Sequence, residues 1–221
     1  TDPQLDRAFV TACKKSGVPG NPVEWTRSLL RMRKSGEFPR AERRTPTLTF
    51  RQMDAYSHGS EIAMRCLAVN VGKTFEEVLC DPRLGKMFDE IAGQYAPGYS
   101  SFEYRWAGLA IRKRGRRAWK LAEQRYRAWL KERLPRRRPV SADWSNYAHP
   151  GVYIVSADKN VLYVGETVDV RSRVEHLRKN AAWQAIEPTS IVPIPADDSP
   201  FALQAILIRR KEPVLNAVEC L

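Results

Sequence analysis

The pattern of apolar residues changes at Pro135-Arg-Arg-Arg-Pro139. Before this segment apolar residues recur every three or four positions, and after it they form short continuous runs at 151–157 and 161–166. The first pattern predicts amphipathic helices and the second predicts strands. Each proline lacks an amide donor and keeps the preceding residue out of helical angles, so a helix ends here. We therefore expect an α+β protein with a helical part over 1–140 and a small α/β part over 146–221.

Local signals divide these two parts further. Helices are predicted over 23–36, over 60–72 with Ser60 as the cap, over 74–95 as two short helices that separate near Pro82, and over 101–115 and 116–134. After the boundary, strands are predicted over 151–157, 161–166 and 190–196, and helices over 168–183 and over 199–211 with Ser199 as the cap. The prolines of the third strand suit an edge or an end of a sheet.

Composition excludes several classes of protein. Apolar residues make up 43% of the chain, which is enough for a core and argues against wholesale disorder. No window approaches the 18 consecutive apolar residues of a membrane span, and the N-terminus has no secretion signal. The four cysteines are far apart and form no C-x-x-C pair, so zinc fingers and a disulfide scaffold are not expected. We expect a cytoplasmic protein without membrane contact.

Positive charge is concentrated in one segment. The chain carries a net charge of +12, and residues 101–138 hold 14 Lys and Arg against three Asp and Glu. Residues 146–221 hold eight against nine. A basic segment without compensating acids indicates a polyanionic partner rather than a solvated surface. We therefore predict binding to DNA, and to duplex DNA in particular, through Arg112, Lys113, Arg114, Arg116, Arg117, Arg125, Arg136, Arg137 and Arg138.

A motif in the last third of the chain is more specific. Gly151-Val152-Tyr153 precedes Tyr163-Val164-Gly165 by ten residues between the tyrosines, and Arg173 follows after ten more. Either tyrosine alone would be an ordinary packing residue of a strand. With the downstream helix and Pro213-x-x-Asn216, the series resembles the GIY-YIG nuclease family over about residues 148–217. The resemblance implies a three-stranded antiparallel sheet flanked by helices, and hydrolysis of DNA phosphodiesters with Mg²⁺ or Mn²⁺.

The resemblance also implies a role for each motif residue. Tyr153 would orient or deprotonate the attacking water, with Tyr163 in support, and Arg173 would bind the scissile phosphate. His176 lies three residues after Arg173, whereas the family has a His or Tyr four residues after its arginine. The resemblance implies that His176 would relay a proton from Tyr153. Asn216 would be a structural hydrogen-bonding residue. A tyrosine base needs its pKa of about 10 lowered by about three units, which requires about 4 kcal/mol of stabilisation of the phenolate.

One position departs from the family pattern. Gln204 stands where the family has its metal-binding glutamate, and an amide is a poor ligand for Mg²⁺. Either the glutamine is native and the protein does not cut, or it replaces a native glutamate so that a complex stays uncut. We favour the replacement because every other motif residue is present. Glu166 is either a loop charge or a weak substitute ligand, and we favour the loop charge.

These observations predict a DNA endonuclease with an inactivating glutamine at 204. A role in bacterial restriction or phage defence is favoured, since the sequence has no zinc finger or repair motif. The alternatives are a non-cutting DNA-binding protein, a repair or branched-DNA endonuclease, and a homing endonuclease. A double-strand cut would need two active sites, as in a homodimer, or two successive nicks.

Overall fold

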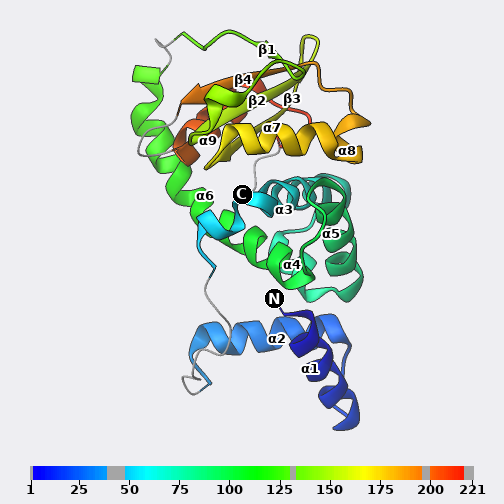
Figure 1. Cartoon of the computed structure of the whole chain (residues 1–221). Helices are drawn as coiled ribbons and strands as arrows, with labels where there is room; N and C mark the ends of the chain where they lie inside the picture. Colours follow the sequence, from blue (N-terminus) through cyan, green and yellow to red (C-terminus); the bar gives the residue numbers. More distant parts are fainter. Residues whose placement is uncertain (1, 39–47, 130–132, 196–199, 217–221) are drawn as a thin grey trace.

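The structure is a computed structural model that describes residues 2–38, 48–129, 133–195 and 200–216. Within these ranges a series of helices precedes a small antiparallel sheet with helices on both faces, so the protein is α+β (Figure 1). The helices before the sheet are α1 (Pro3–Lys15), α2 (Pro22–Ser35), α3 (Phe50–Val71), α4 (Phe75–Cys80), α5 (Pro82–Tyr95) and α6 (Ser101–Trp129). Among the described residues, no helix is long and apolar enough to cross a bilayer.

Helix α3 begins ten residues earlier than predicted. Its cap is Thr49, which forms a reciprocal capping box with Gln52, whereas Ser60 is fully buried inside the helix. Met53 and Tyr56 in the added turns are almost completely buried in the helical core, so burial fixes this start as firmly as the cap does. The earlier start extends one continuous helix face toward the sheet.

Two other helix predictions also change. The predicted helices 101–115 and 116–134 form one continuous helix, α6, because Gly115 weakens a helix without ending it. Helix α6 packs against α3 and reaches α9 (Pro200–Lys211), so it connects the helical core with the sheet (Figure 1). The predicted helix 168–183 is divided at Asn180, which has extended angles and caps α8 (Ala181–Gln184) after α7 (Val170–Lys179). Ser199 lies outside the described residues.

The sheet has four strands rather than three. Strands β2 (Gly151–Ala157), β3 (Asn160–Thr167) and β4 (Ser190–Pro195) match the predicted ones, and the fourth is β1 (Arg138–Pro139). The order is β1-β4-β2-β3, with all pairs antiparallel. Residues 138–139 were assigned to the helical part over 1–140, but their extended backbone pairs with Ser190 and Ile191 of the sheet. Pro193 lies beyond this short pairing, so it does not interrupt the ladder to β1.

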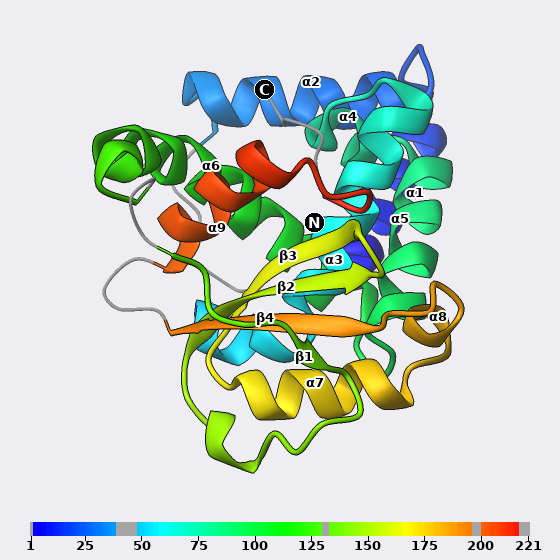
Figure 2. The same ribbon diagram turned by 90° about the horizontal axis from the view of Figure 1, so that it is seen from above.

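The two faces of the sheet carry different helices. Helices α7 and α8 cover one face, α9 covers the other, and a short 3₁₀ helix, η1 (Ser145–Tyr147), precedes β2 (Figure 2). The core under α7 includes Ile62 from α3, so the helical part packs against this face. Both motif tyrosines lie on the same face. The predicted site therefore lies between the sheet and α3.

Candidate active site

The two motif tyrosines are neighbours on adjacent strands. Tyr153 on β2 and Tyr163 on β3 have ring centroids 6.0 Å apart, and both side chains are buried. Gly165 pairs with Tyr153 across the strands. A Cβ atom there would lie 2.5 Å from the Tyr163 ring and 2.6 Å from the Tyr153 hydroxyl. The glycine of the second tripeptide thus makes room for both rings.

Arg173 on α7 reaches α3 instead of solvent. Its side chain is 3% exposed, and Nη2 donates to the backbone carbonyl of Asp54 and, at 3.2 Å, to Oδ2 of the Asp54 side chain. Its Nη1 donates to Nδ1 of His58. The hydrogen of that imidazole consequently lies on Nε2, which is 3.1 Å from the Tyr95 carbonyl. Arg173, which was predicted to bind a phosphate, is therefore already hydrogen-bonded to groups from the helical part.

His176 lies next to this cluster. Its Nε2 is 2.7 Å from the Tyr95 carbonyl and 3.3 Å from Nε2 of His58. Burial lowers the pKa of His58 well below its ordinary value, and Arg173 and His176 lower it further. The pKa of His176 is also lowered, mainly by burial. Nε2 of His176 is hydrogen-bonded to the Tyr95 carbonyl and not to Tyr153. This arrangement therefore gives no direct support to a proton relay from Tyr153.

A carboxylate from α3 lies beside Gln204. Nε2 of Gln204 donates to Oε2 of Glu61 at 3.1 Å and to the Val164 carbonyl at 3.2 Å. Tyr163 donates its hydroxyl to the same Oε2 at 2.6 Å. Both Glu61 and Gln204 are buried. The helical part thus places a carboxylate next to the residue where the resemblance expects one.

Asn216 stabilises the edge of the sheet. Its side chain is fully buried, accepts from the Val164 amide at 3.2 Å and donates to the Val164 carbonyl at 2.6 Å. These two bonds reproduce the pairing of a neighbouring strand along β3. This geometry suits a structural hydrogen-bonding residue.

The electrostatics of the tyrosines oppose ionisation. Burial raises the pKa of Tyr153, and the Tyr153 hydroxyl has no hydrogen-bond partner among the described residues. Burial also raises the pKa of Tyr163 well above its ordinary value, and the Glu61 carboxylate adds to the rise. A base needs the opposite shift. In this arrangement both tyrosines are therefore neutral phenols.

Glu166 is a partly buried ion-pair partner rather than a loop charge. It lies near the end of β3 and forms an ion pair with Arg114 of α6. Burial raises the pKa of the Glu166 carboxyl, against the effect of Arg114. The guanidinium of Arg114 also lies 4.0 Å from the centroid of the Phe50 ring. Arg114 is therefore less available to DNA than its position in the basic segment predicts.

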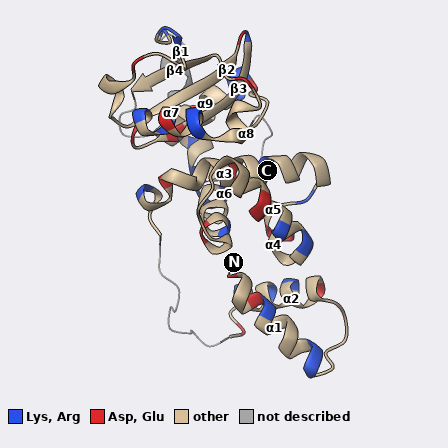
Figure 3. Cartoon of the chain, turned by 45° about the vertical axis from the view of Figure 1, so that its right-hand side comes forward, with Lys and Arg blue, Asp and Glu red and all other residues tan. Residues whose placement is uncertain are grey.

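The other basic residues differ in their surroundings. Lys113, Arg117 and Arg136 are exposed, and Arg112 pairs with Glu76 at 2.9 Å. Arg137 donates to the Asp158 carbonyl, and Arg138 donates to the Asp143 carbonyl and lies 5.1 Å from the centroid of Tyr147. The side chains of Arg116 and Arg125 lie outside the described residues. Basic residues also occur on α1, α2 and α7, where acidic residues accompany them (Figure 3).

Two adjoining cavities lie near Gln204, and only the smaller one is lined by a motif tyrosine, Tyr163. The smaller, about 20 Å³, is lined by Glu61, Tyr163, Glu166 and Gln204. Such a space holds about one water molecule, so a phosphodiester does not fit into it. The larger, about 570 Å³, shares Phe50 and Arg114 with it and is lined by Trp106, Phe201, Lys113 and Arg117 among others. Aromatic rings beside cations suit a nucleic-acid strand.

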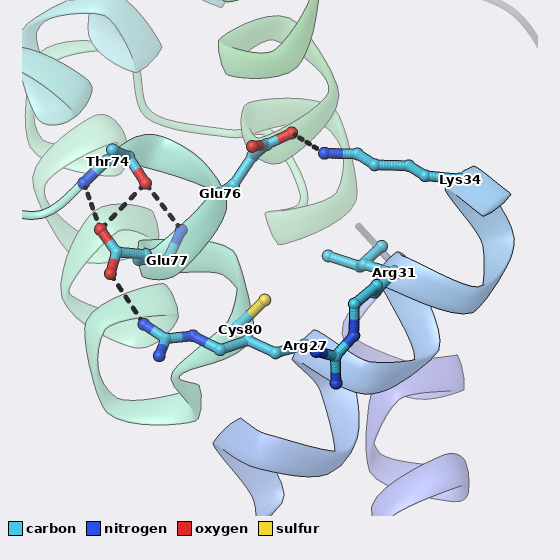
Figure 4. Close-up of a pocket in the computed structure, with 8 residues that line it drawn as sticks. Arg27, Arg31, Lys34, Thr74, Glu76, Glu77 and Cys80 are labelled. Carbon is cyan, nitrogen blue, oxygen red and sulfur yellow. Dashed lines mark hydrogen bonds and ion pairs between the residues drawn. The ribbon is translucent and has the colours of Figure 1, made fainter.

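A separate cavity of about 330 Å³ lies between α2 and α4. Arg27 pairs with Glu77 at 2.8 Å and Lys34 with Glu76 at 3.0 Å across this space (Figure 4). Arg31 lines the same space beside Arg27. Because Arg27 and Lys34 are paired with carboxylates, this cavity is a weaker candidate for a polyanion than the larger cleft beside Arg114.

A metal ion would depend on few protein ligands here. In the part of the chain that the structure describes, no three His, Cys, Asp or Glu side chains gather as a metal site. Mg²⁺ is commonly held by one or two carboxylates with water and substrate phosphates. The buried carboxylate of Glu61 beside Gln204 fits this sparse mode. Glu61 and Gln204 do not form a complete protein cage.

Sequence reasoning missed the contribution of α3. Asp54, His58 and Glu61 follow one another by four and three positions, which places them on one face of a helix. These residues contact Arg173, Tyr163 and Gln204. This polar series was a readable signal, but a helix that begins at Ser60 excludes its first two members. The motif residues thus meet a second polar surface.

No protein-family model matches the chain, and it has no significant match among curated proteins or solved structures. The resemblance to GIY-YIG nucleases therefore rests on the motif residues and their spacing in the sequence.

Proposed function

We propose that this chain is a nuclease that hydrolyses phosphodiester bonds in DNA with Mg²⁺ or Mn²⁺. The observation that carries the proposal is the gathering of Tyr153, Tyr163, Arg173 and Gln204 where the sheet meets α3. These residues come from β2, β3, α7 and α9, so neither local sequence nor one element explains their proximity. Two phenols, a guanidinium and a carboxylate beside them are groups with which a phosphodiester can be held and a water oriented.

Glu61 compensates for the glutamine at 204 in this proposal. It would hold the ion together with water and substrate oxygens, while the Gln204 amide holds Glu61 in place. When bound, the ion would neutralise charge on the phosphate and lower the pKa of a coordinated water. Tyr153 would orient the attacking water through its unpartnered hydroxyl, and Arg173 would bind phosphate oxygens.

In this proposal α6 binds the DNA substrate. The neutral last third of the chain has little charge to hold DNA, whereas Lys113 and Arg117 are exposed beside the aromatic cleft that adjoins Glu61. A strand held by these cations would pass the small cavity at Tyr163. Restriction or phage defence is the biological role that we favour for such an enzyme.

A non-cutting DNA-binding protein is the second candidate. The raised pKa of both tyrosines and the burial of Arg173 favour it, because they describe groups that are not ready for catalysis. In that case Gln204 is native and the motif residues serve as the packing surface for α3.

The test is cleavage of plasmid, branched and native phage DNA by the Gln204 protein and by Gln204→Glu, with Mg²⁺ or with EDTA. We expect metal-dependent cleavage by Gln204→Glu, because a second carboxylate joins Glu61. Inert Gln204→Glu protein on every DNA would favour the non-cutting candidate.

A further inference from the structure

The Asp54 carboxylate lies in a cradle of hydrogen-bond donors from the sheet and α7. Thr167 donates its hydroxyl to Oδ2 at 2.9 Å, the Val168 amide donates to Oδ1 at 3.0 Å, and Arg173 Nη2 lies 3.2 Å from Oδ2. All three donors belong to residues 167–173, between the end of β3 and the first turns of α7. Three donors of three kinds therefore converge on one anionic group from another part of the chain.

The chemistry of this cradle is that of an oxyanion site. A guanidinium, a hydroxyl and a backbone amide bind carboxylate and phosphate oxygens in the same way, since both present several charged acceptors. A phosphodiester carries one negative charge, so it could replace Asp54 without changing the charge balance at Arg173. The hydroxyl and the amide fix the direction of approach, which a lone arginine would not do.

The cradle opens toward solvent. The Asp54 side chain is 19% exposed and Val168 is 43% exposed, whereas Arg173 is 3% exposed on the inner side. Met53 and Tyr56 anchor the same turns of α3 in the helical core. The Asp54 side chain can therefore rotate out of the cradle while the helix, with Glu61 two turns further on, stays in position.

We propose that the cradle formed by Thr167, the Val168 amide and Arg173 is a phosphate-binding site for a DNA strand, and that Asp54 is an internal occupant that keeps it closed. This inference rests on the proposed function, because it names how a substrate phosphate reaches Arg173. Binding of the DNA strand requires the Asp54 carboxylate to leave the cradle. The apparent affinity for DNA is therefore lower when Asp54 occupies the cradle in a larger fraction of the molecules.

The experiment measures binding of a fluorescent duplex by anisotropy in EDTA, so that no cutting occurs. The proteins are the unsubstituted chain, Asp54→Ala, Asp54→Asn and Asp54→Ala/Thr167→Val. Glu90→Gln is the matched control, because it removes one acidic charge from an exposed pair with Lys86 on α5. If Asp54 is seated in about nine molecules of ten, Asp54→Ala tightens binding about tenfold beyond Glu90→Gln. Thr167→Val cancels most of that gain.

Four results would overturn the inference. Asp54→Ala could bind no more tightly than Glu90→Gln while remaining folded, or its gain could survive Thr167→Val. If Asp54→Ala does not fold, Asp54→Asn replaces it, and an Asn variant that binds DNA like the control would also overturn the inference.

Cleavage assays with Mg²⁺ separate the two proposals. A tighter, Thr167-dependent complex without cleavage by any variant, Gln204→Glu included, supports the cradle and contradicts the nuclease. DNA cleavage at a rate that Asp54→Ala leaves unchanged supports the nuclease and contradicts the cradle.

Discussion

Tyr163 donates its hydroxyl to Oε2 of Glu61 at 2.6 Å, across 102 positions of the chain. The bond joins the second motif tyrosine to a helix that lies outside the family resemblance. It brings a carboxylate to the position where Gln204 lacks one, and it also helps to keep Tyr163 neutral. The helical part therefore contributes a side chain to the candidate site.

Gln204→Glu is expected to raise the affinity for Mn²⁺ by at least about tenfold, or about 1.4 kcal/mol. Two carboxylates in contact repel each other unless a cation or a proton lies between them. Titration calorimetry, or the loss of the electron paramagnetic resonance signal of free Mn²⁺, measures this affinity without any turnover. Adding Glu61→Gln should remove the gain. A gain that survives Glu61→Gln would show that Glu61 is not a ligand.

Asp54→Ala is expected to destabilise the fold by roughly 3 kcal/mol, because it leaves the buried Arg173 charge with less compensation. Sulfate or phosphate at millimolar concentration should restore part of this loss by binding in the emptied cradle. Urea unfolding with chloride and with sulfate at equal ionic strength measures the difference. Glu90→Gln should show no sulfate-specific gain, and an equal gain in both variants would contradict a vacated anion site.

Stability should decrease as the pH falls below about 6.5, the ordinary pKa of histidine. The pKa of His58 is lowered in the folded protein, so the unfolded chain binds the proton first and each pH unit costs up to about 1.4 kcal/mol until the folded pKa is reached. The groups that face His58 are Arg173 and His176 on α7 and the Tyr95 carbonyl on α5.

His58→Gln should weaken this pH dependence, whereas His149→Gln, outside the cluster, should retain it. Urea midpoints at pH 7.5 and 5.5 give the comparison for the three proteins. Equal losses of stability in the unsubstituted protein and in His58→Gln would assign the effect to other groups.

Lys113→Ala/Arg117→Ala should flatten the salt dependence of DNA binding by up to about 1.8 log–log units, at about 0.9 per phosphate contact. These two cations are exposed, whereas Arg112 and Arg114 pair with acids, so replacing the latter pair should change the slope less. Replacing Arg136, Arg137 and Arg138 by Ala tests the second basic triplet. The measurement is duplex affinity at several salt concentrations, and unchanged slopes throughout would identify a merely solvated surface.

The sequence was informative where a local rule applied. Caps and prolines located α2, α4 and α5 closely, and the short continuous apolar runs that hold the paired tripeptides located β2 and β3. The start of α3 was missed because burial of Met53 and Tyr56 decides it together with the Thr49 cap. Strand β1 was missed because two residues carry no periodicity. The contacts of Asp54 and Glu61 depend on how two parts of the chain pack, which spacing within either part does not reveal.

The most direct measurement of the central claim is the single-turnover rate of DNA cleavage by Gln204→Glu and by Gln204→Glu/Tyr153→Phe, with duplex affinity measured on the same DNA. We expect the phenylalanine variant to lose cleavage by orders of magnitude while its affinity is almost unchanged, because the hydroxyl acts on the water and makes no contact that holds the strand. A Tyr153→Phe enzyme that cuts within a few-fold of its parent would show that Tyr153 does not orient the attacking water.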